Sequence, residues 1–278
     1  MTDHIGSDQQ YLLTEQYKDA SNLMARIALH ERFSTNPYDW HRWVFERFHI
    51  PSQARILELG CGPGKLWLNN AERIPEGWQI TLTDFSPGML QENQRNLQAV
   101  PHSFEYHIAD AQSIPFADET FDAVIANHML YHVPDRAKAI AEVRRVLKPE
   151  GHFYAATNGE NHLRELDILG TRVVAGVEVY SGELHSFKLE TGAEELGRQF
   201  AHVDLHIMEG DLVVTEVEPI IAFMRSTRLG AQLDEQHIQT MRDIISLEIA
   251  KNGSFFITKS TGVFDAYGSV TTVDTDTR

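Results

Sequence analysis

The chain has 278 residues and a hydrophobic content of 42%, which suits one large globular domain or one domain with an appended lid. Its 24 Lys and Arg residues stand against 40 Asp and Glu residues, so the formal net charge is −16. Such an acidic chain repels a phosphate backbone, and no basic patch is large enough to reverse the sign. A nucleic-acid partner is therefore not expected.

Cysteine content limits the chain further. Cys61 is the single cysteine, which excludes an intramolecular disulfide and any Cys-rich zinc or iron–sulfur site, and favours a reducing, cytoplasmic location. Residues 1–10 contain neither a basic nor an apolar export segment, and no apolar run approaches the ~20 residues that span a bilayer. We expect no export and no membrane partner.

The first fifth of the chain is predicted to be helical. Apolar residues recur at helical spacing between about 11 and 49, most clearly over 37–48, where they share one face. The predicted organisation is therefore an N-terminal helical arm or lid at 1–50, followed by one domain at 51–278.

Strands and helices then alternate. Apolar runs predict five strands at 54–60, 78–84, 104–109, 121–127 and 152–157. Helices are predicted between them at about 87–98 and 135–147. This alternation, with its short connections, predicts an α/β fold in which a doubly wound, Rossmann-like and mostly parallel sheet is covered on both faces.

The alternation breaks after residue 161, where the pattern predicts two insertions among further regular elements. The elements expected here are an irregular or helical insertion near 163–187, a helix at 190–200, a long strand at 203–214, a helical insertion near 216–250 and a last strand at 254–264.

Three glycines follow the first strand, in the segment ELGCGPGK. Gly60, Gly62 and Gly64 allow positive φ angles and let backbone N–H groups approach a ligand where a Cβ would collide. Their G-x-G-x-G spacing differs from the G-x-G-x-x-G of pyrophosphate-binding folds, so it favours a ligand without phosphates. A tight strand-to-helix turn is the alternative reading.

Two aspartates stand at the ends of the next two strands. Asp84 lies 24 residues after Gly60, where a carboxylate can accept from two ribose hydroxyls. A helix N-cap or a turn residue is the alternative for Asp84. Asp110 closes the third strand, where it can accept from an exocyclic amine of adenine, and a plain turn aspartate is its alternative.

Together these segments resemble the class I S-adenosylmethionine-dependent methyltransferases, in particular the small-molecule, ubiquinone-biosynthesis-like (methyltransferase type 11) group. The matching segments are ILELGCGPG at 56–64, TDFSPGML at 83–90, ADAQSIPF at 109–116, FDAVIANHMLYHV at 121–133 and RRVLKPEGHF at 144–153. The resemblance covers residues 54–158 closely and the C-terminal strands loosely. These motifs are specific for the family when they occur together, whereas each motif alone is a weak indication.

The resemblance implies S-adenosylmethionine as cofactor, S-adenosylhomocysteine as product, and a seven-stranded sheet whose antiparallel last strand is 254–264. The implied cofactor site consists of Glu58, Gly60, Cys61, Gly62, Gly64, Asp84, Phe85, Met89, Asp110, Ala111 and Asn127. In it the glycines border the methionyl part and Asp84 holds the ribose. Phe85 and Met89 flank the adenine, whose edge Asp110 and Ala111 read, and Asn127 lies beside the sulfonium.

Two histidines follow the fourth strand in NHMLYHV, at the edge where ligands bind. A metal pair is one reading of His128 and His132, but no second ligand set occurs, so no metal is expected. A structural role is another. The resemblance favours catalysis, in which His132 takes the acceptor proton and contacts a tyrosine of the N-terminal helix, Tyr17 or Tyr11. The catalytic candidates are thus His132, Tyr17 and His128.

The expected function is transfer of one methyl group from S-adenosylmethionine to an O, N or C atom of a small organic acceptor, by in-line displacement. A non-catalytic sensor or partner subunit that binds the same cofactor is the alternative, and an NAD-dependent oxidoreductase is disfavoured by the glycine spacing. Acceptor choice is expected from 11–49, 163–187 and 216–250. The polar candidates, which nothing ranks, are His162, Glu165, Tyr180, Glu183 and His185. The oligomeric state stays open.

Overall fold

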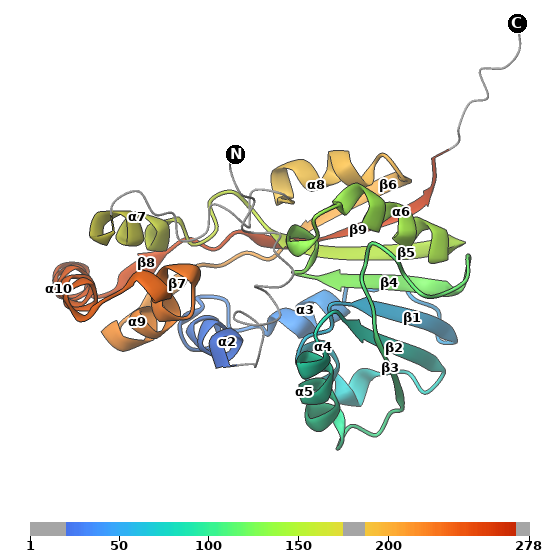
Figure 1. Ribbon diagram of the computed structural model, residues 1–278, viewed down its shortest axis with the longest axis horizontal. Coiled ribbons are helices and arrows are strands. Elements are labelled where there is room, and N and C mark those ends of the chain that lie inside the picture. The colour runs from blue at the N-terminus through green and yellow to red at the C-terminus, as the bar shows by residue number, and fades with distance from the viewer. Residues whose placement is uncertain (1–20, 175–186, 271–278) are drawn as a thin grey trace, which may run out of the picture.

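The computed structural model describes residues 21–174 and 187–270, and its centre is a seven-stranded sheet (Figure 1). The sheet has the strand order β3-β2-β1-β4-β5-β9-β6. Its strands are β1 (Ala54–Leu59), β2 (Trp78–Asp84), β3 (Phe104–Ile108), β4 (Phe121–Asn127), β5 (Leu147–Asn158), β6 (Phe200–Ile207) and β9 (Thr261–Ser269). The first five pair in parallel, and β9 is antiparallel to both β5 and β6. The predicted fold class is confirmed.

Helices cover both faces of this sheet. One face packs against α3 (Trp40–Phe45), α4 (Lys65–Leu68) and α5 (Pro87–Leu97), and the other against α6 (Arg136–Val146) and α8 (Leu189–Leu196). The described residues also form the short 3-10 helices η3 (Ala71–Arg73), η4 (Leu130–His132) and η5 (Arg228–Gln232). In β1, Ile56 packs on the first face and Leu57 on the second. A strand buried on both sides needs such an unbroken apolar run, which is why β1 was recognisable.

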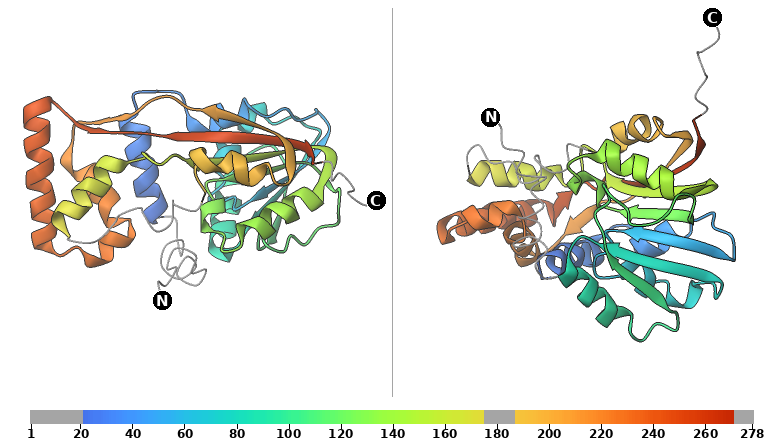
Figure 2. Two further views of the ribbon diagram at one scale, coloured as in Figure 1. Left: turned by 90° about the horizontal axis from the view of Figure 1, so that it is seen from above. Right: turned by 45° about the vertical axis from the view of Figure 1, so that its right-hand side comes forward.

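A second lobe lies at one end of the sheet (Figures 1 and 2). It consists of α2 (Ser21–Phe33), α7 (Arg164–Val173), α9 (Val217–Arg225), α10 (Glu235–Asn252) and the two-stranded sheet of β7 (Leu212–Val214) and β8 (Phe255–Ile257). These elements share an apolar cluster of their own. Segments that are far apart in the chain therefore build one layer over the end of the sheet.

Two predicted strands were wrong in the same way. The expected strand at 203–214 is divided into β6 and β7, and the expected last strand at 254–264 is divided into β8 and the start of β9. The neighbouring antiparallel segments leave the large sheet together and pair again in the second lobe. Gly210, with φ +131°, lies in one of the breaks. Apolar alternation resumes after each break, so periodicity alone did not reveal it.

Helix lengths also differ from the prediction. The helix expected at 37–48 is only α3, whose N-cap Asp39 accepts from the backbone N–H of Arg42 at 2.9 Å. The helix expected at 190–200 ends at Leu196, because β6 begins at Phe200. The helices expected in 216–250 are present as α9 and α10. In the described part of 1–50, α2 packs with α9 in the second lobe. The division at residue 50 stays a prediction.

Candidate active site

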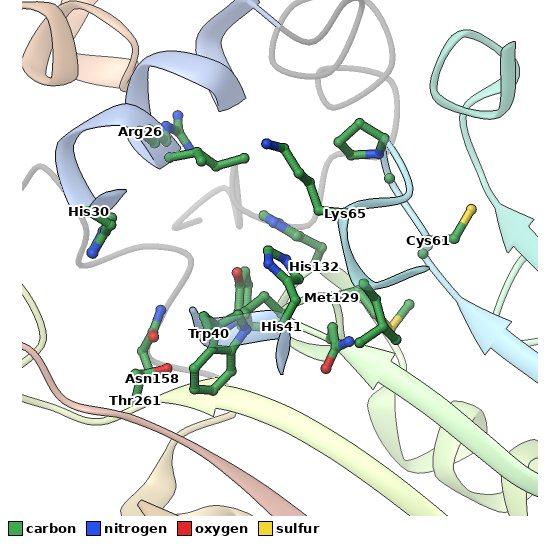
Figure 3. Close-up of a pocket in the computed structure, with 18 of the residues that line it drawn as sticks. Arg26, His30, Trp40, His41, Cys61, Lys65, Met129, His132, Asn158 and Thr261 are labelled. Atoms are coloured by element: carbon green, nitrogen blue, oxygen red, sulfur yellow. The ribbon is translucent and has the colours of Figure 1, made fainter. Parts of the chain in front are cut away.

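A cavity of about 780 Å³ lies where the loops after β1, β2 and β4 meet the second lobe (Figure 3). This volume is within the range of about 300–1,000 Å³ that small-molecule sites occupy. The predicted site residues that line it are Glu58, Gly60, Cys61, Gly62, Asp84, Phe85, Met89, Asp110, Ala111, Asn127, His128 and His132. Gly64 is not among the lining residues, and Tyr17 and Tyr11 lie outside the described residues. One cavity thus collects residues that are spread over 75 positions of the chain (58 to 132).

The glycine loop has positive φ at each of its three glycines. A Cβ at Gly60 would stand 2.8 Å from the Cβ of Met129, so this position requires glycine for packing as well as for φ. A Cβ at Gly62 would meet nothing within 4 Å, because the open cavity lies there. Gly64 is the N-cap of α4 and has φ +80°. Its lack of a Cβ leaves room for Asn93, whose amide donates to the Gly62 carbonyl at 3.0 Å. Gly64 therefore shapes the loop from outside the cavity.

Asp84 ties the glycine loop to the next strand. One carboxylate oxygen accepts from the backbone N–H of Gly62 at 3.0 Å, and the other accepts from that of Ser86 at 2.8 Å. The N-cap of α5 is Ser86 and not Asp84, so the helix-cap alternative fails for Asp84. Each carboxylate oxygen keeps a second lone pair, and the residue lines the cavity. Asp84 can therefore accept two further hydrogen bonds from a ligand.

Glu58, which precedes the glycine loop, and Cys61, which lies within it, are both buried. Glu58 is buried and accepts from the indole N–H of Trp67 at 2.6 Å. Burial raises the pKa of Glu58 to about 8, so its carboxyl is largely protonated at pH 7. Burial also raises the pKa of the Cys61 thiol, and its backbone N–H donates to Thr83 at 2.9 Å. Cys61 is thus a small, inert thiol that joins the loop to β2.

The residues predicted for the adenine lie along one wall of the cavity. Asp110 accepts from the backbone N–H of Gln112 at 2.9 Å, so the turn expected as its alternative role is present, and Asp110 lines the cavity as well. Ala111 and Met89 are buried, whereas Phe85 is 36% exposed. This arrangement leaves a carboxylate, a backbone N–H and an aromatic ring beside one space, which suits a flat heterocycle.

The side-chain amide of Asn127 is buried in the wall of the cavity. This residue ends β4 and lines the cavity, and both polar atoms of its side chain are buried without a hydrogen-bond partner among the described residues. A buried amide left unpaired costs about 1–3 kcal/mol, so native proteins rarely keep one unless a ligand or water completes it. Asn127 therefore indicates a polar ligand at this point.

The two histidines after β4 both line the cavity. His128 has φ +52°, and its ring lies 5.1 Å from that of Trp40. Burial lowers the pKa of His128 to about 4, so it is neutral at pH 7. His132 ends η4 and lies edge-on to Tyr131 at 4.5 Å. The residues are not on one α-helix, yet the turn brings both to the same space.

Four further segments contribute lining residues, and only Lys65, the last residue of ELGCGPGK, belongs to a motif. The principal residues are His30 from α2, Lys65 from α4, Asn158 at the end of β5, His162 after it, and Lys259 between β8 and β9. His162 was one of five unranked polar candidates. Of the others, Glu165 accepts from the backbone N–H of Thr258 at 2.8 Å, and Tyr180, Glu183 and His185 lie outside the described residues. Only the fold brings these segments together, so no local signal was available.

The described residues contain neither a metal-ligand cluster nor a membrane-spanning helix. Among residues 21–174 and 187–270, no three His, Cys, Asp or Glu side chains gather in a way that could hold a metal ion. In the same ranges, no helix is both long enough and apolar enough to cross a membrane.

Comparison with known families matches residues 57–155 to the model of a methyltransferase domain. Residues 57–155 are thus similar to class I methyltransferase domains. The matched residues contain the glycine loop, Asp84, Asp110, Asn127, His128 and His132. Domains of this class use S-adenosylmethionine as methyl donor, as the resemblance implied.

Curated relatives match less than half of the chain. The ubiquinone/menaquinone biosynthesis C-methyltransferase UbiE of Desulfotalea psychrophila is 35% identical over 112 residues, which are 40% of this chain and 44% of that protein. The demethylmenaquinone methyltransferase of Symbiobacterium thermophilum is 32% identical over 116 residues, 41% of this chain and 46% of that one. The chain therefore spans less than half the length of these relatives.

Solved structures match the fold beyond the methyltransferase domain. Phosphoethanolamine N-methyltransferase 2 of Haemonchus contortus, in complex with S-adenosylhomocysteine, has a TM-score of 0.57 at 18% identity and covers 94% of this chain and 59% of that one. The [4+2]-cyclase SpnF has a TM-score of 0.56 at 19% identity, and the match covers 94% of this chain and 95% of that one. One neighbour is named a methyltransferase and the other a cyclase, so at this distance the likeness shows the fold alone.

Proposed function

We propose that this protein is a methyltransferase that transfers one methyl group from S-adenosylmethionine to an O, N or C atom of a small organic acceptor. The observation that carries the proposal is the unpaired amide of Asn127, which faces the same cavity as Gly62 and Asp84. A structural role would have satisfied this amide with protein groups. A cofactor beside it explains why it has none among the described residues.

The cofactor fits the residues present. The space over Gly62 would be filled by any Cβ, the Asp84 carboxylate has two lone pairs for a ribose diol, and Asp110 with Ala111 can read an adenine edge. When bound, S-adenosylmethionine supplies an electrophilic methyl group on a sulfonium. The chain's own contribution is to hold the acceptor in line with that methyl group and to exclude water.

His132 is our candidate for the general base when the acceptor atom carries a proton. A useful base has a pKa near the working pH, and His128, at about 4, is too weakly basic for that task. We therefore assign His128 to positioning against Trp40 and His132 to proton removal. The predicted contact of His132 with Tyr17 is part of this proposal and lies outside the described residues.

The acceptor is selected by residues outside the matched domain. His30, His162 and Lys259 lie before or after residues 57–155, so the match to the methyltransferase-domain model does not include them. This supports a small polar acceptor without identifying it. We further propose a cytoplasmic location, which the single, buried, free Cys61 supports and which cell fractionation would test.

The test is methyl transfer itself. The full chain is incubated with methyl-labelled S-adenosylmethionine and a metabolite extract, and label is sought in small molecules. We expect a labelled product, and a loss of about 100-fold in turnover in His132→Ala, which is within the range for removing a general base. A wild-type protein that binds S-adenosylhomocysteine but labels no acceptor in any extract would instead indicate a non-catalytic binding protein.

A further inference from the structure

The part of the cavity farthest from the glycine loop is built from three separate segments. We call it the acceptor end and define it by His30, Asn158, His162, Lys259 and Thr261. Figure 3 shows His30, Asn158 and Thr261 on one side of the cavity, Cys61 and Lys65 on the other, and Trp40 between them. The acceptor end is thus separate from the cofactor residues.

Lys259 brings a half-buried cation to this end. Its ammonium donates to the hydroxyl of Ser34 at 3.2 Å, and among the described residues no carboxylate lies within ion-pair distance of it. Lys65, on the other side of the cavity, has Glu31 at 3.5 Å. Burial lowers the pKa of Lys259, and the charge of Asp211, whose carboxylate accepts from the backbone N–H of Lys259 at 3.0 Å, offsets only part of this free-energy cost. An anionic ligand would remove that cost.

A stacked histidine pair adds neutral donors and acceptors. His162 is buried, and its Nδ1 accepts from the backbone N–H of Ser260 at 3.2 Å, which leaves the ring proton on Nε2. The ring of His30 lies parallel to it, with centroids 5.8 Å apart and planes 3° apart. Burial lowers the pKa of both rings, that of His30 to about 3, so neither carries charge at pH 7. They can hydrogen-bond an oxygen atom without adding a second positive charge.

The sign of the charge at this end is unusual for a chain of net charge −16. The acidic residues that line the cavity are Glu31, Asp39, Glu58, Asp84 and Asp110. Of these, only Glu31 comes from a segment of the acceptor end, α2, and it is paired with Lys65 at 3.5 Å. One ammonium surrounded by neutral donors matches one negative charge, as a carboxylate has, better than the greater charge of a phosphate.

We propose that the acceptor end binds a carboxylate group of the methyl acceptor, with the Lys259 ammonium as its cationic partner and the His162 Nε2–H as a second donor. This rests on the proposed function and narrows its substrate class to small organic acids. The carboxylate anchors the acceptor, and the methylated atom lies elsewhere in the molecule, toward Asn127 and His132.

A competing assignment is that Lys259 holds the carboxylate of the cofactor itself. Lys65 is better placed for that task, because it is the first residue of α4, directly after the glycine loop. The two assignments differ in one measurable respect. Loss of the Lys259 charge leaves S-adenosylhomocysteine binding unchanged if the lysine serves the acceptor, and weakens it if the lysine serves the cofactor.

The experiment separates labelled products by charge. The full chain is incubated with methyl-labelled S-adenosylmethionine and a metabolite extract, and the labelled products are applied to an anion exchanger at pH 7. Wild type, Lys259→Met, Lys259→Arg and a control with an exposed lysine, Lys251→Met, are compared. S-adenosylhomocysteine binding is measured for each variant.

We expect the wild-type product to be retained as an anion. Lys259→Met should label it at least about tenfold less, as expected when a charged hydrogen bond is lost, with unchanged S-adenosylhomocysteine affinity. Lys259→Arg should keep most of the activity, and Lys251→Met all of it.

A labelled product that contains no carboxyl group, as identified by mass spectrometry, would overturn the carboxylate assignment even if a variant failed to fold, because the chemistry of the product requires no variant. Full activity in Lys259→Met, or weakened S-adenosylhomocysteine binding in it, would also overturn the assignment while leaving the proposed function intact. No labelled product from wild type would contradict the proposed function itself.

Discussion

The two ends of the cavity are built in different ways. The cofactor end, which we define by Gly60, Gly62, Asp84, Asp110 and Asn127, comes from the carboxyl ends of strands of one sheet and from the loops that follow them. The acceptor end takes side chains from α2, from the end of β5 and the turn after it, and from the β8–β9 connection and the start of β9, which no motif links. A site made by a repeated strand-to-loop pattern can be recognised locally, whereas a site made by insertions depends on the whole fold.

The ends also differ in their titratable groups. At the cofactor end burial raises the pKa of the acids Glu58 and Asp84, and at the acceptor end it lowers that of the bases His30, His162 and Lys259. In both cases burial favours the neutral form. The effects on stability therefore have opposite pH dependence at the two ends.

Asp84→Ala, at the cofactor end, should have the largest effect on S-adenosylhomocysteine binding. Two hydrogen bonds from a ribose to a carboxylate contribute about 1.5 kcal/mol each, so their loss should weaken S-adenosylhomocysteine binding about 100-fold. Equilibrium dialysis would measure this, with the exposed Glu76→Ala as control. An Asp84→Ala protein that is folded by thermal melting and retains wild-type affinity would contradict the ribose role.

Gly62→Ala tests whether the open space over the loop is ligand space. Gly62 and Gly253 both have positive φ and free room for a Cβ, so alanine at either should cost a similar backbone strain of about 1 kcal/mol. Only Gly62 borders the cavity. We expect Gly62→Ala alone to weaken S-adenosylhomocysteine binding, by roughly tenfold for a steric cost of about 1.4 kcal/mol. Equal S-adenosylhomocysteine affinities in Gly62→Ala and Gly253→Ala would contradict a place for Gly62 in the binding site.

Glu58→Gln should change how the free energy of unfolding depends on pH above pH 6. The folded pKa of about 8 lies above the unfolded value, so this group's contribution to the free energy of unfolding is lost as pH rises toward 8. Between pH 6 and 7 the loss is about 1 kcal/mol for one group. Glutamine cannot ionise, so denaturant unfolding at the two pH values should show a smaller decline in the variant. Parallel curves would mean that Glu58 is already ionised in the fold.

His30→Gln should change how the free energy of unfolding depends on pH below pH 6.5, where the effect of pH is opposite to that at Glu58. The folded pKa of about 3 lies below the unfolded value of His, so the stabilising contribution is present above pH 6.5 and is lost as pH falls. Between pH 6 and 5 this amounts to about 1 kcal/mol. Chemical denaturation should show that the variant loses less stability than wild type over this interval. A steeper loss in the variant would contradict the neutral state of His30.

The sequence predicted the sheet and the cofactor end well. The observed bounds of β2 and β4 coincide with the predicted ones, because both strands are apolar runs bounded by turn residues. Asp84 and Asn127 could be placed in the cavity because the carboxyl ends of parallel strands share one edge. The roles assigned to these residues stay predictions.

The acceptor end could not be predicted for physical reasons. Lys259 lies in a connection that periodicity interpreted as the middle of one strand, since the apolar pattern continues on both sides of it. His30 and His162 are 132 positions apart (162 − 30), and only the packing of α2 in the second lobe brings their rings into contact. Side-chain clusters of this kind have no sequence pattern of their own.

The central claim is that the cofactor end binds S-adenosylmethionine and its product. Calorimetric titration of the full wild-type chain with S-adenosylhomocysteine, and separately with NAD, tests it most directly. We predict saturable binding of one S-adenosylhomocysteine per chain and no binding of NAD. Binding of NAD without any response to S-adenosylhomocysteine would contradict the account.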